Sequence, residues 1–418
     1  MLIKMEVESS YTGKLQVNVV TRENVPVRDA TVTIAASDSP NNIIERLTTN
    51  SSGQTETIEL PAPPIELSLN EANTTRPYTT YNIRIEALGY ETEFIENAEI
   101  LPDVLAIQNV RLTSKNASLT EDIMIPDHTL YGEYPPKVPE EEIKPVNEPG
   151  EIVLSRVVVP EIIVVHDGIP SDSSAQNYYV NYRDYIKNVA SSEIYATWPT
   201  ATIEANVLAI MSFTLNRVYT EWYRNKGYDF TITSSTAYDQ KWIYGRNIFE
   251  SISLVVDNIF DQYLSRPDVR QPILTQYCDG KRVTCPNWLS QWGSCNLGER
   301  GYSTIEIIRY YYGDDMYINT AEQIAGIPIS WPGYDLDIGA SGQKVAQIQE
   351  QLDTIAQGYT EIPRLNADGI YGENTRDAVK AFQKIFDLPQ TGIVDFATWY
   401  KISQIYVGIT RIAEGIPR

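Results

Sequence analysis

The sequence contains few cysteines and few histidines. Among its 418 residues are three cysteines and two histidines. Three cysteines are too few for the dense disulfide framework of a small secreted domain. His128 and His166 stand far apart in the chain, which weakens the case for a histidine-dependent triad or a histidine-rich metal site. We therefore expect no metal and no cofactor.

Long apolar runs and basic charge are also scarce. No stretch approaches eighteen uninterrupted apolar residues, so the sequence predicts no transmembrane helix. The opening letters MLIKMEVESS lack a basic segment followed by an apolar one, and we expect no Sec signal peptide. The 33 basic residues are outnumbered by 55 acidic ones, for a net charge of −22. Such a chain should bind neither nucleic acid nor anionic membranes nonspecifically, whereas a glycan partner stays compatible with it.

The length predicts two to four domains. Residues 1–114 are expected to be the first of them, an all-β unit. Apolar and polar residues alternate over residues 14–20, 30–35 and 81–87, and turn residues separate these segments. Short strands at this spacing are typical of a β-sandwich. The letters PVRDATVTI, TTNSSGQT and LGYETEF resemble the prealbumin-like and carboxypeptidase-regulatory-like sandwich domains, a resemblance that implies no catalysis.

Residues 115–160 change in composition. Prolines recur there, and residues 140–142 form an acidic run. A stretch of this kind buries little apolar surface, so the sequence predicts an extended linker. Two interpretations stay open, a plain spacer and a protease-sensitive activation segment, because exposed linkers are where processing occurs. We expect an activating cut between about residues 140 and 160.

Residues 161–330 are predicted to be a mostly helical α+β domain. Helices are expected over residues 178–190, 201–226, 248–264 and 304–311, with a short strand at residues 273–276. Glu193 lies between the first two helices, among aromatic and aliphatic neighbours. Desolvation raises the pKa of such a carboxyl group, which lets it act as a general acid near neutral pH. The alternative is an ordinary glutamate at a helix end.

The C-terminal residues 331–418 have a pattern of their own. The letters GQKVAQIQEQL, DGIYGENT, AVKAFQ and TGIVDFATW resemble the peptidoglycan-binding three-helix module. Gly369 and Gly372 bracket a tight turn, and Asn374 or Thr375 is expected to cap the helix that follows. The resemblance implies a wall-binding anchor rather than an active site. The predicted fold class is therefore a multidomain α+β protein: sandwich, helical α+β domain, three-helix module.

Beside that anchor, the stretch around Glu193 resembles the SpoIID/amidase-enhancer family. The letters YIKNVASSEIYATWPTATIEANVLAIMSFTLN are similar to its first motif, and PILTQY, LSQWG and IIRYYYG to three later ones, in order. The resemblance implies a lytic transglycosylase that cleaves the bond between N-acetylmuramic acid and N-acetylglucosamine. It makes Glu193 the catalytic acid and base. The implied groove residues are Gln240, Ser290, Gln291, Tyr310, Tyr311 and Tyr312.

The chain also departs from that family. An arginine of the second helix is Met211 here, and Arg217 either replaces it or lies on the surface. Some family members carry zinc through Cys and His. Cys278, Cys285 and Cys295 supply only three candidate ligands without a nearby histidine, so a disulfide between two of them, or buried thiols, fits better than zinc.

The order of the parts resembles the SleC family of clostridial spore cortex-lytic enzymes. That resemblance implies a zymogen stored in the spore without a Sec signal, whose partners are cortex peptidoglycan and a Csp-type subtilisin-like protease. Two alternatives remain: a noncatalytic peptidoglycan-binding or assembly protein, and an amidase enhancer that acts on a partner enzyme. An additional N-acetylmuramoyl-L-alanine amidase activity would need a metal or nucleophile site that the sequence does not display.

Overall fold

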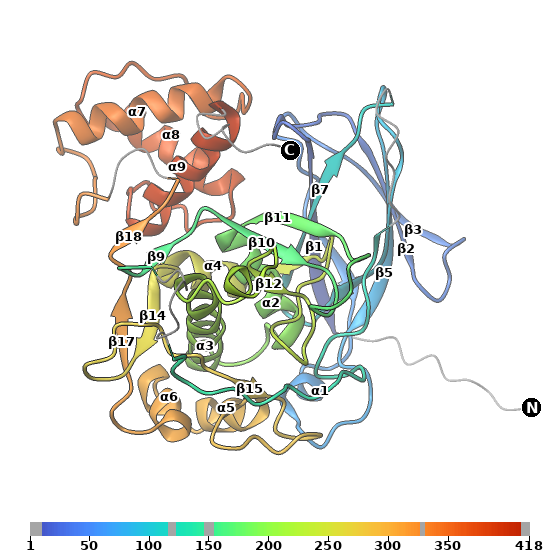
Figure 1. The fold of residues 1–418 in the computed structure, drawn as a ribbon. Coiled ribbons are helices and arrows are strands. Elements are labelled where there is room, and N and C mark those ends of the chain that lie inside the picture. The colour runs from blue at the N-terminus through green and yellow to red at the C-terminus, as the bar shows by residue number, and fades with distance from the viewer. Residues whose placement is uncertain (1–10, 116–122, 146–153, 327–330, 411–418) are drawn as a thin grey trace, which may run out of the picture.

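The computed structural model describes residues 11–115, 123–145, 154–326 and 331–410. Figure 1 shows a β-rich part in blue, a central mixed part in green and yellow, and a helical part in orange and red. The molecule is thus a mixed α/β protein of several parts whose C-terminal region is helical. Across the described ranges, helix length and apolar character together fall short of what a bilayer crossing requires.

Two sheets make up the β-rich part. One contains, in spatial order, β13 (Ile248–Phe249), β7 (Leu105–Leu112), β1 (Thr12–Thr21) and β4 (Ile58–Pro61). The other contains β3 (Ile43–Thr48), β2 (Thr31–Ala36), β5 (Thr79–Glu86), β6 (Glu93–Ile100) and β8 (Ile123–Met124). Leu15, Val17 and Val19 alternate along β1 and are fully buried, which is the period-two pattern read from the sequence. A short helix, α1 (Glu66–Leu69), lies between β4 and β5.

The β-rich part is joined to the rest of the chain by strands and by buried charge. β13 comes from the central region and pairs with β7, while β8 comes from residues beyond 115 and pairs with β6. Glu99 on β6 accepts a hydrogen bond from Arg246 of the central region at 2.9 Å, and both side chains are buried. The contacts between the two parts therefore reach well past the predicted boundary at residue 114.

The central region surrounds one buried helix, α3. Its helices are α2 (Tyr182–Glu193), α3 (Thr200–Tyr219), α4 (Glu250–Ile259), α5 (Gln291–Glu299) and α6 (Thr304–Tyr312), with a 3₁₀ turn at Arg224–Lys226. Its short strands are β9 (Val158–Val159), β10 (Ile162–His166), β11 (Asn177–Asn181), β12 (Ile232–Thr233), β14 (Gln262–Ser265), β15 (Tyr277–Cys278), β16 (Leu289–Ser290), β17 (Tyr317–Thr320) and β18 (Gln323–Ile324). α3 contacts α4, α5, α6 and β14, and nearly all of its residues are buried.

Four predictions about local structure in this region were wrong. The helix expected over residues 201–226 ends at Tyr219, and only a 3₁₀ turn follows at Arg224–Lys226. Residues 178–181 form strand β11, because they pair with β10 and not with the helix that follows. The helix expected to reach residue 264 ends at Ile259, and β14 then pairs with β17. The strand expected at 273–276 begins only at Tyr277, since the N–H groups of Ile273 and Leu274 donate singly to Leu264 and Glu142 and form no continuous ladder. Pairing with a neighbouring strand overrides local propensity at β11 and β14.

Residues 123–145, which we call the strap, differ from the expected solvated spacer. They contain no helix, yet Ile125, His128 and Lys144 are buried. The strap has few apolar residues to pack. Hydrogen bonds and ion pairs with the central region hold it instead, as with Lys144, whose N–H donates to Gln271 at 2.9 Å. Composition records apolar content but not the partners of charged side chains, which is why it predicted an exposed chain.

Helices α7 (Gln343–Ala356), α8 (Glu373–Ile385) and α9 (Phe396–Thr410) form the C-terminal part. α8 is capped by Gly372 rather than by Asn374 or Thr375, because Thr375 is buried and accepts a hydrogen bond from Gln349. The turn at Gly369 has a φ of +73°, a conformation that favours glycine. The side chain of Arg183 on α2 donates to the carbonyl of Tyr400 on α9 at 2.9 Å, which joins this part to the central region.

Gln383 is the buried polar centre of the C-terminal part. Its amide nitrogen donates to Thr391, Ile393 and Thr398 at 2.9–3.1 Å, and its oxygen accepts from the Gly392 N–H at 2.8 Å. We expect Gln383→Leu to lower the free energy of unfolding by about 2–4 kcal/mol, because buried groups then lose their partners. Calorimetric melting of the full chain checks this. Gln357→Leu, at an exposed position, is the matched control, and equal melting of both variants would contradict the assignment.

Candidate active site

Glu193 is the last residue of α2, and the chain leaves the helix there because Ile194 is extended (φ −135°, ψ 151°). Only 3% of Glu193 is exposed. Aromatic rings follow it: Trp198 lies 5.3 Å from Trp292 and 5.9 Å from Tyr195, centroid to centroid. The sequence correctly placed the carboxylate at the end of a helix.

Two hydrogen bonds hold the Glu193 carboxyl group. The backbone N–H of Lys241 donates to Oε1 at 2.7 Å, and the hydroxyl of Tyr277 donates to Oε2. Burial raises the pKa of Glu193 above its ordinary value, while the Lys137 ammonium, the Tyr277 hydroxyl and the Lys241 N–H oppose the rise. The net direction is upward, toward the protonated form that a general acid requires.

Lys137 brings a positive charge from the strap to this carboxyl group. Its ammonium donates to the carbonyl of Asp239 and lies 5.1 Å from the ring centre of Tyr277 and 5.0 Å from that of Phe213. Desolvation lowers the pKa of Lys137, and Glu193 is the first group that opposes this shift. A lysine of the strap therefore stands beside Glu193.

The strap also contacts the backbone on both sides of Glu193. The N–H and hydroxyl of Thr129 donate to the carbonyl of Ser192 at 3.1 and 3.0 Å. His128, fully buried, places Nε2 3.3 Å from the carbonyl of Ile194, and its ring lies 4.5 Å from that of Tyr195. Together with the low exposure of the acid, these contacts close Glu193 off from solvent.

Arg217 is neither on the surface nor a partner of Glu193. Its guanidinium is fully buried and donates through Nε to Asp239 at 2.7 Å and through both Nη atoms to Glu140 of the strap. The expectation of a surface arginine was wrong, because two carboxylates offset the cost of burying this charge. Met211 is also fully buried. Lys137, with Lys241 as a weaker second, is the cation that acts on Glu193 among the described residues, and both come from outside the α3 helix.

The structure brings one of the predicted groove residues close to Glu193. Gln240 directly precedes Lys241 and is fully buried, where it accepts hydrogen bonds from Tyr185 at 3.0 Å and Thr214 at 2.8 Å. All of these contacts are internal. Gln240 therefore packs in the interior, next to the residue whose N–H donates to the acid.

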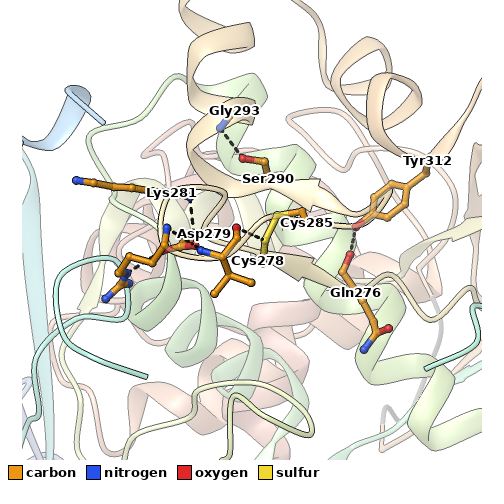
Figure 2. The surroundings of a disulfide bond; sticks show 10 residues. Gln276, Cys278, Asp279, Lys281, Cys285, Ser290, Gly293 and Tyr312 are labelled. Atoms are coloured by element: carbon orange, nitrogen blue, oxygen red, sulfur yellow. Dashed lines mark hydrogen bonds and ion pairs between the residues drawn. A yellow bond between two sulfur atoms is a disulfide. The ribbon is translucent and has the colours of Figure 1, made fainter. Parts of the chain in front are cut away.

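The other predicted groove residues lie around α5 and α6. Ser290 caps α5 by accepting from the Gly293 N–H at 3.0 Å, and Gln291 follows it, buried. Tyr312 is buried and donates to the carbonyl of Gln276 at 2.9 Å, next to Tyr277. Tyr311 is half-buried, and Tyr310 is 66% exposed. Figure 2 shows the Ser290–Gly293 and Tyr312–Gln276 bonds on either side of a disulfide.

That disulfide joins Cys278 to Cys285, and Cys295 is a buried free thiol. Cys278 follows Tyr277, so the cross-linked loop begins one residue after the hydroxyl that contacts Glu193. Within the loop, Arg282 pairs with Asp279 at 2.8 Å and donates to the strap carbonyls of Thr129 and Gly132. In the part of the chain that the structure describes, no three His, Cys, Asp or Glu side chains gather as metal ligands would.

Three residues beside Glu193 were not singled out from the sequence. Tyr277 lies inside one of the quoted motifs, PILTQY, so the signal was present. Lys241 acts through its backbone N–H, which leaves no trace in the side-chain pattern. Lys137 lies in the strap, where composition predicted a spacer. It reaches the acid only through the tertiary fold.

Comparison with known proteins identifies one segment. Residues 341–402 match the family described as "Putative peptidoglycan binding domain". The chain thus carries such a domain over α7–α9, which supports peptidoglycan as a partner. The prediction of a peptidoglycan-binding domain in the C-terminal part is therefore confirmed. A search of curated proteins finds no match.

Solved structures give only weak likenesses. The N-terminal domain of SleB shares 26% identity over 18% of this chain and 99% of that one, with a TM-score of 0.16. The Bacillus anthracis TIE protein shares 13% sequence identity over 25% of this chain and 17% of its own, with a TM-score of 0.18. The 3-chlorocatechol 1,2-dioxygenase of Rhodococcus opacus 1CP shares 14% sequence identity over 26% of this chain and 61% of its own, with a TM-score of 0.17. At these TM-scores none of the three bears on fold or function.

The ammonium of Lys137 lowers the pKa of Glu193, so removing it should raise that pKa further. We expect Lys137→Met to move the carboxyl titration of Glu193 to higher pH. Carbon-13 NMR of the labelled Glu193 carboxyl group measures it. Lys384→Met, an exposed position in α8, should leave the titration unchanged. A titration that is unaffected, or that moves to lower pH, in Lys137→Met would show that Lys137 does not act on the acid.

Proposed function

We propose that this chain is the zymogen of a spore cortex-lytic enzyme of the SleC type. Its activity would be that of a lytic transglycosylase with a SpoIID-like domain over residues 161–330. The observation that carries the proposal is Glu193, a buried carboxyl group with a raised pKa, in a chain that also bears a peptidoglycan-binding domain. The implied site of action is the spore cortex. The implied activator is a subtilisin-like protease.

The proposed reaction needs one carboxyl group. Protonated Glu193 donates its proton to the glycosidic oxygen as the bond from C1 of the muramoyl sugar breaks. The carboxylate then accepts the proton of the 6-hydroxyl of the same sugar as that oxygen bonds to C1. The product is a 1,6-anhydro sugar, no water is consumed, and Glu193 ends protonated as it began. Hydrolytic glycosidases pair two carboxyl groups because one must activate water or form the covalent intermediate.

Tyr277 and Lys241 support both steps of this cycle. Their hydrogen bonds favour the carboxylate, whereas burial favours the acid. A group balanced between the two forms can give and take a proton in succession. Gln240, Ser290, Gln291 and Tyr310–Tyr312 stay proposed substrate contacts of the opened site. Tyr310 is the one most exposed.

The strap supports the zymogen part of the proposal. It contacts Ser192 and Ile194 on either side of the acid, and its β8 strand pairs with the N-terminal sheets. We propose that residues 1–114 are a sandwich pro-domain to which the strap belongs, and that both leave together after cleavage. The expected cut between 140 and 160 includes residues 146–153, which lie outside the described residues. The C-terminal helices would form the three-helix wall anchor.

One observation favours a second function. Met211 is buried where the resembled family has an arginine. A protein without that cation in its opened site would bind peptidoglycan without cutting it, as an assembly protein or as an amidase enhancer. Product analysis separates these readings. Unchanged glycan supports the binder, and released stem peptides indicate amidase activity.

We expect Glu193→Gln to abolish release of anhydro-muropeptides from cortex peptidoglycan by the processed protein, since an amide cannot donate the proton. A loss of at least about 100-fold is expected. Mass spectrometry of the soluble products measures it, and cosedimentation with the wall should be unchanged. Glu204→Gln, a partly buried glutamate of α3, is the control. Wild-type turnover by Glu193→Gln would remove Glu193 from the mechanism.

The closed site predicts that the uncut chain is inactive. A specific protease site placed within residues 146–153 should give a chain that releases anhydro-muropeptides only after cutting. The control is the same site placed in the exposed loop at residues 171–174, where cutting should leave the chain inactive. Equal activity of cut and uncut chains would mean that the strap does not inhibit.

A further inference from the structure

The central region holds residues 137–144 of the strap as a receptor holds an extended peptide. The strap N–H of Val138 donates to the carbonyl of Ala237 at 2.6 Å, and the Leu274 N–H donates to the carbonyl of Glu142 at 2.9 Å. Backbone bonds of this kind are typical of peptide recognition by strand addition, although no sheet forms here. They bind a peptide backbone regardless of its side chains.

Two glutamine side chains complete this recognition. Gln276 donates to the carbonyl of Val138 at 2.8 Å and accepts from the Glu140 N–H at 2.8 Å. Gln271 donates to the carbonyl of Lys144 at 3.0 Å and accepts from the Lys144 N–H at 2.9 Å. In each buried side-chain amide, the nitrogen thus donates to a strap carbonyl and the oxygen accepts from a strap N–H. An amide that makes both bonds complements the donors and acceptors of a peptide backbone.

Two arginines in the same groove bind the acidic side chains of the strap. Arg217 holds Glu140 through both Nη atoms, and Arg266 holds Glu142 through Nε and Nη2. Such two-point pairing is the geometry that guanidinium offers to carboxylates. Each arginine also has a second carboxylate in the central region itself: Asp239 for Arg217 and Asp315 for Arg266. These partners can keep both guanidinium groups in place after the strap leaves.

One end of the groove lies beside the proposed catalytic acid, and the groove leads away from it. It begins at Lys137, beside Glu193, and continues to Glu140 and Glu142. Lys137 and Glu142 are five positions apart, so an extended chain spans at most about 18 Å between them. A substrate whose sugar is cut at Glu193 and whose peptide branches from that sugar would place its peptide along this path.

We propose that this groove binds the acidic stem peptide of the glycan substrate, and that the strap occupies it as a mimic of that peptide. The inference rests on the proposed function for the identity of the ligand. The groove itself rests on the contacts of Gln271, Gln276, Arg217 and Arg266 with the strap. Lys137 would then occupy the place of the sugar, and Glu140 and Glu142 the places of the peptide carboxylates.

Binding tests the proposal without any cleavage. The full chain with Glu140→Gln and Glu142→Gln keeps every groove residue but loosens the strap. Hydrogen exchange of residues 137–144 shows whether the strap is released. We expect this protein to bind a fluorescent L-alanyl-γ-D-glutamyl-diaminopimelate tripeptide in an anisotropy titration. The affinity for its carboxyl-amidated form should be lower by about tenfold or more, as expected when charge-assisted bonds are lost. If the double variant fails to fold, the wild-type chain cut within 146–153 is titrated instead.

Arg266 provides the matched variant, since it is partly exposed and can be changed with less risk to folding than Arg217. Arg266→Gln should weaken tripeptide binding about tenfold, whereas Arg300→Gln, on the exposed end of α5, should not. In the processed enzyme, Arg266→Gln should raise the KM for peptide-bearing glycan and leave that for peptide-free glycan unchanged. Equal binding of the acidic and amidated peptides overturns the proposal, as does absence of binding once the strap has exchanged. If the chain binds the tripeptide but cuts no glycan, the proposed transglycosylase activity is wrong and the proposed peptide-binding groove still stands.

Discussion

Glu193 ends helix α2 and is almost completely buried, so its carboxylate loses the stabilisation that water would give it. Two hydrogen bonds, from Tyr277 and Lys241, reduce that cost, and the Lys137 ammonium reduces it further. The net effect of burial is still a raised pKa. The central helices, the disulfide loop and the strap all meet around this carboxyl group.

Charged groups hold the strap because its apolar residues are too few to do so. Arg217 lies between Asp239 and Glu140 with no exposure to water, and Lys144 adds a second cation to Glu140 at 2.6 Å. Removing one partner of such a buried pair typically costs about 3–5 kcal/mol, because the other charge stays behind unpaired.

Sequence patterns predicted the parts of this fold that depend on neighbours along the chain. The alternation of Leu15, Val17 and Val19 indicated β1, and the motifs of residues 341–402 indicated the peptidoglycan-binding domain. The disulfide was left open among three cysteines, since spacing cannot decide which thiols meet. Strand β11 was read as helix because its apolar residues suit both periods, and only its pairing with β10 decides between them.

The sequence by itself determined that a lone carboxylate would stand at a helix end, and its motifs indicated a wall-binding domain after it. The first is a local property of periodicity, and the second rests on the resemblance of those motifs to a known module. Only the tertiary structure decided which groups stand beside the acid. Lys137 lies 56 positions before Glu193 and Tyr277 lies 84 after it. No pattern along the chain relates such distant residues. Their meeting is set by burial and charge pairing in three dimensions, and one of them lies in the stretch that the sequence predicted to be an extended linker.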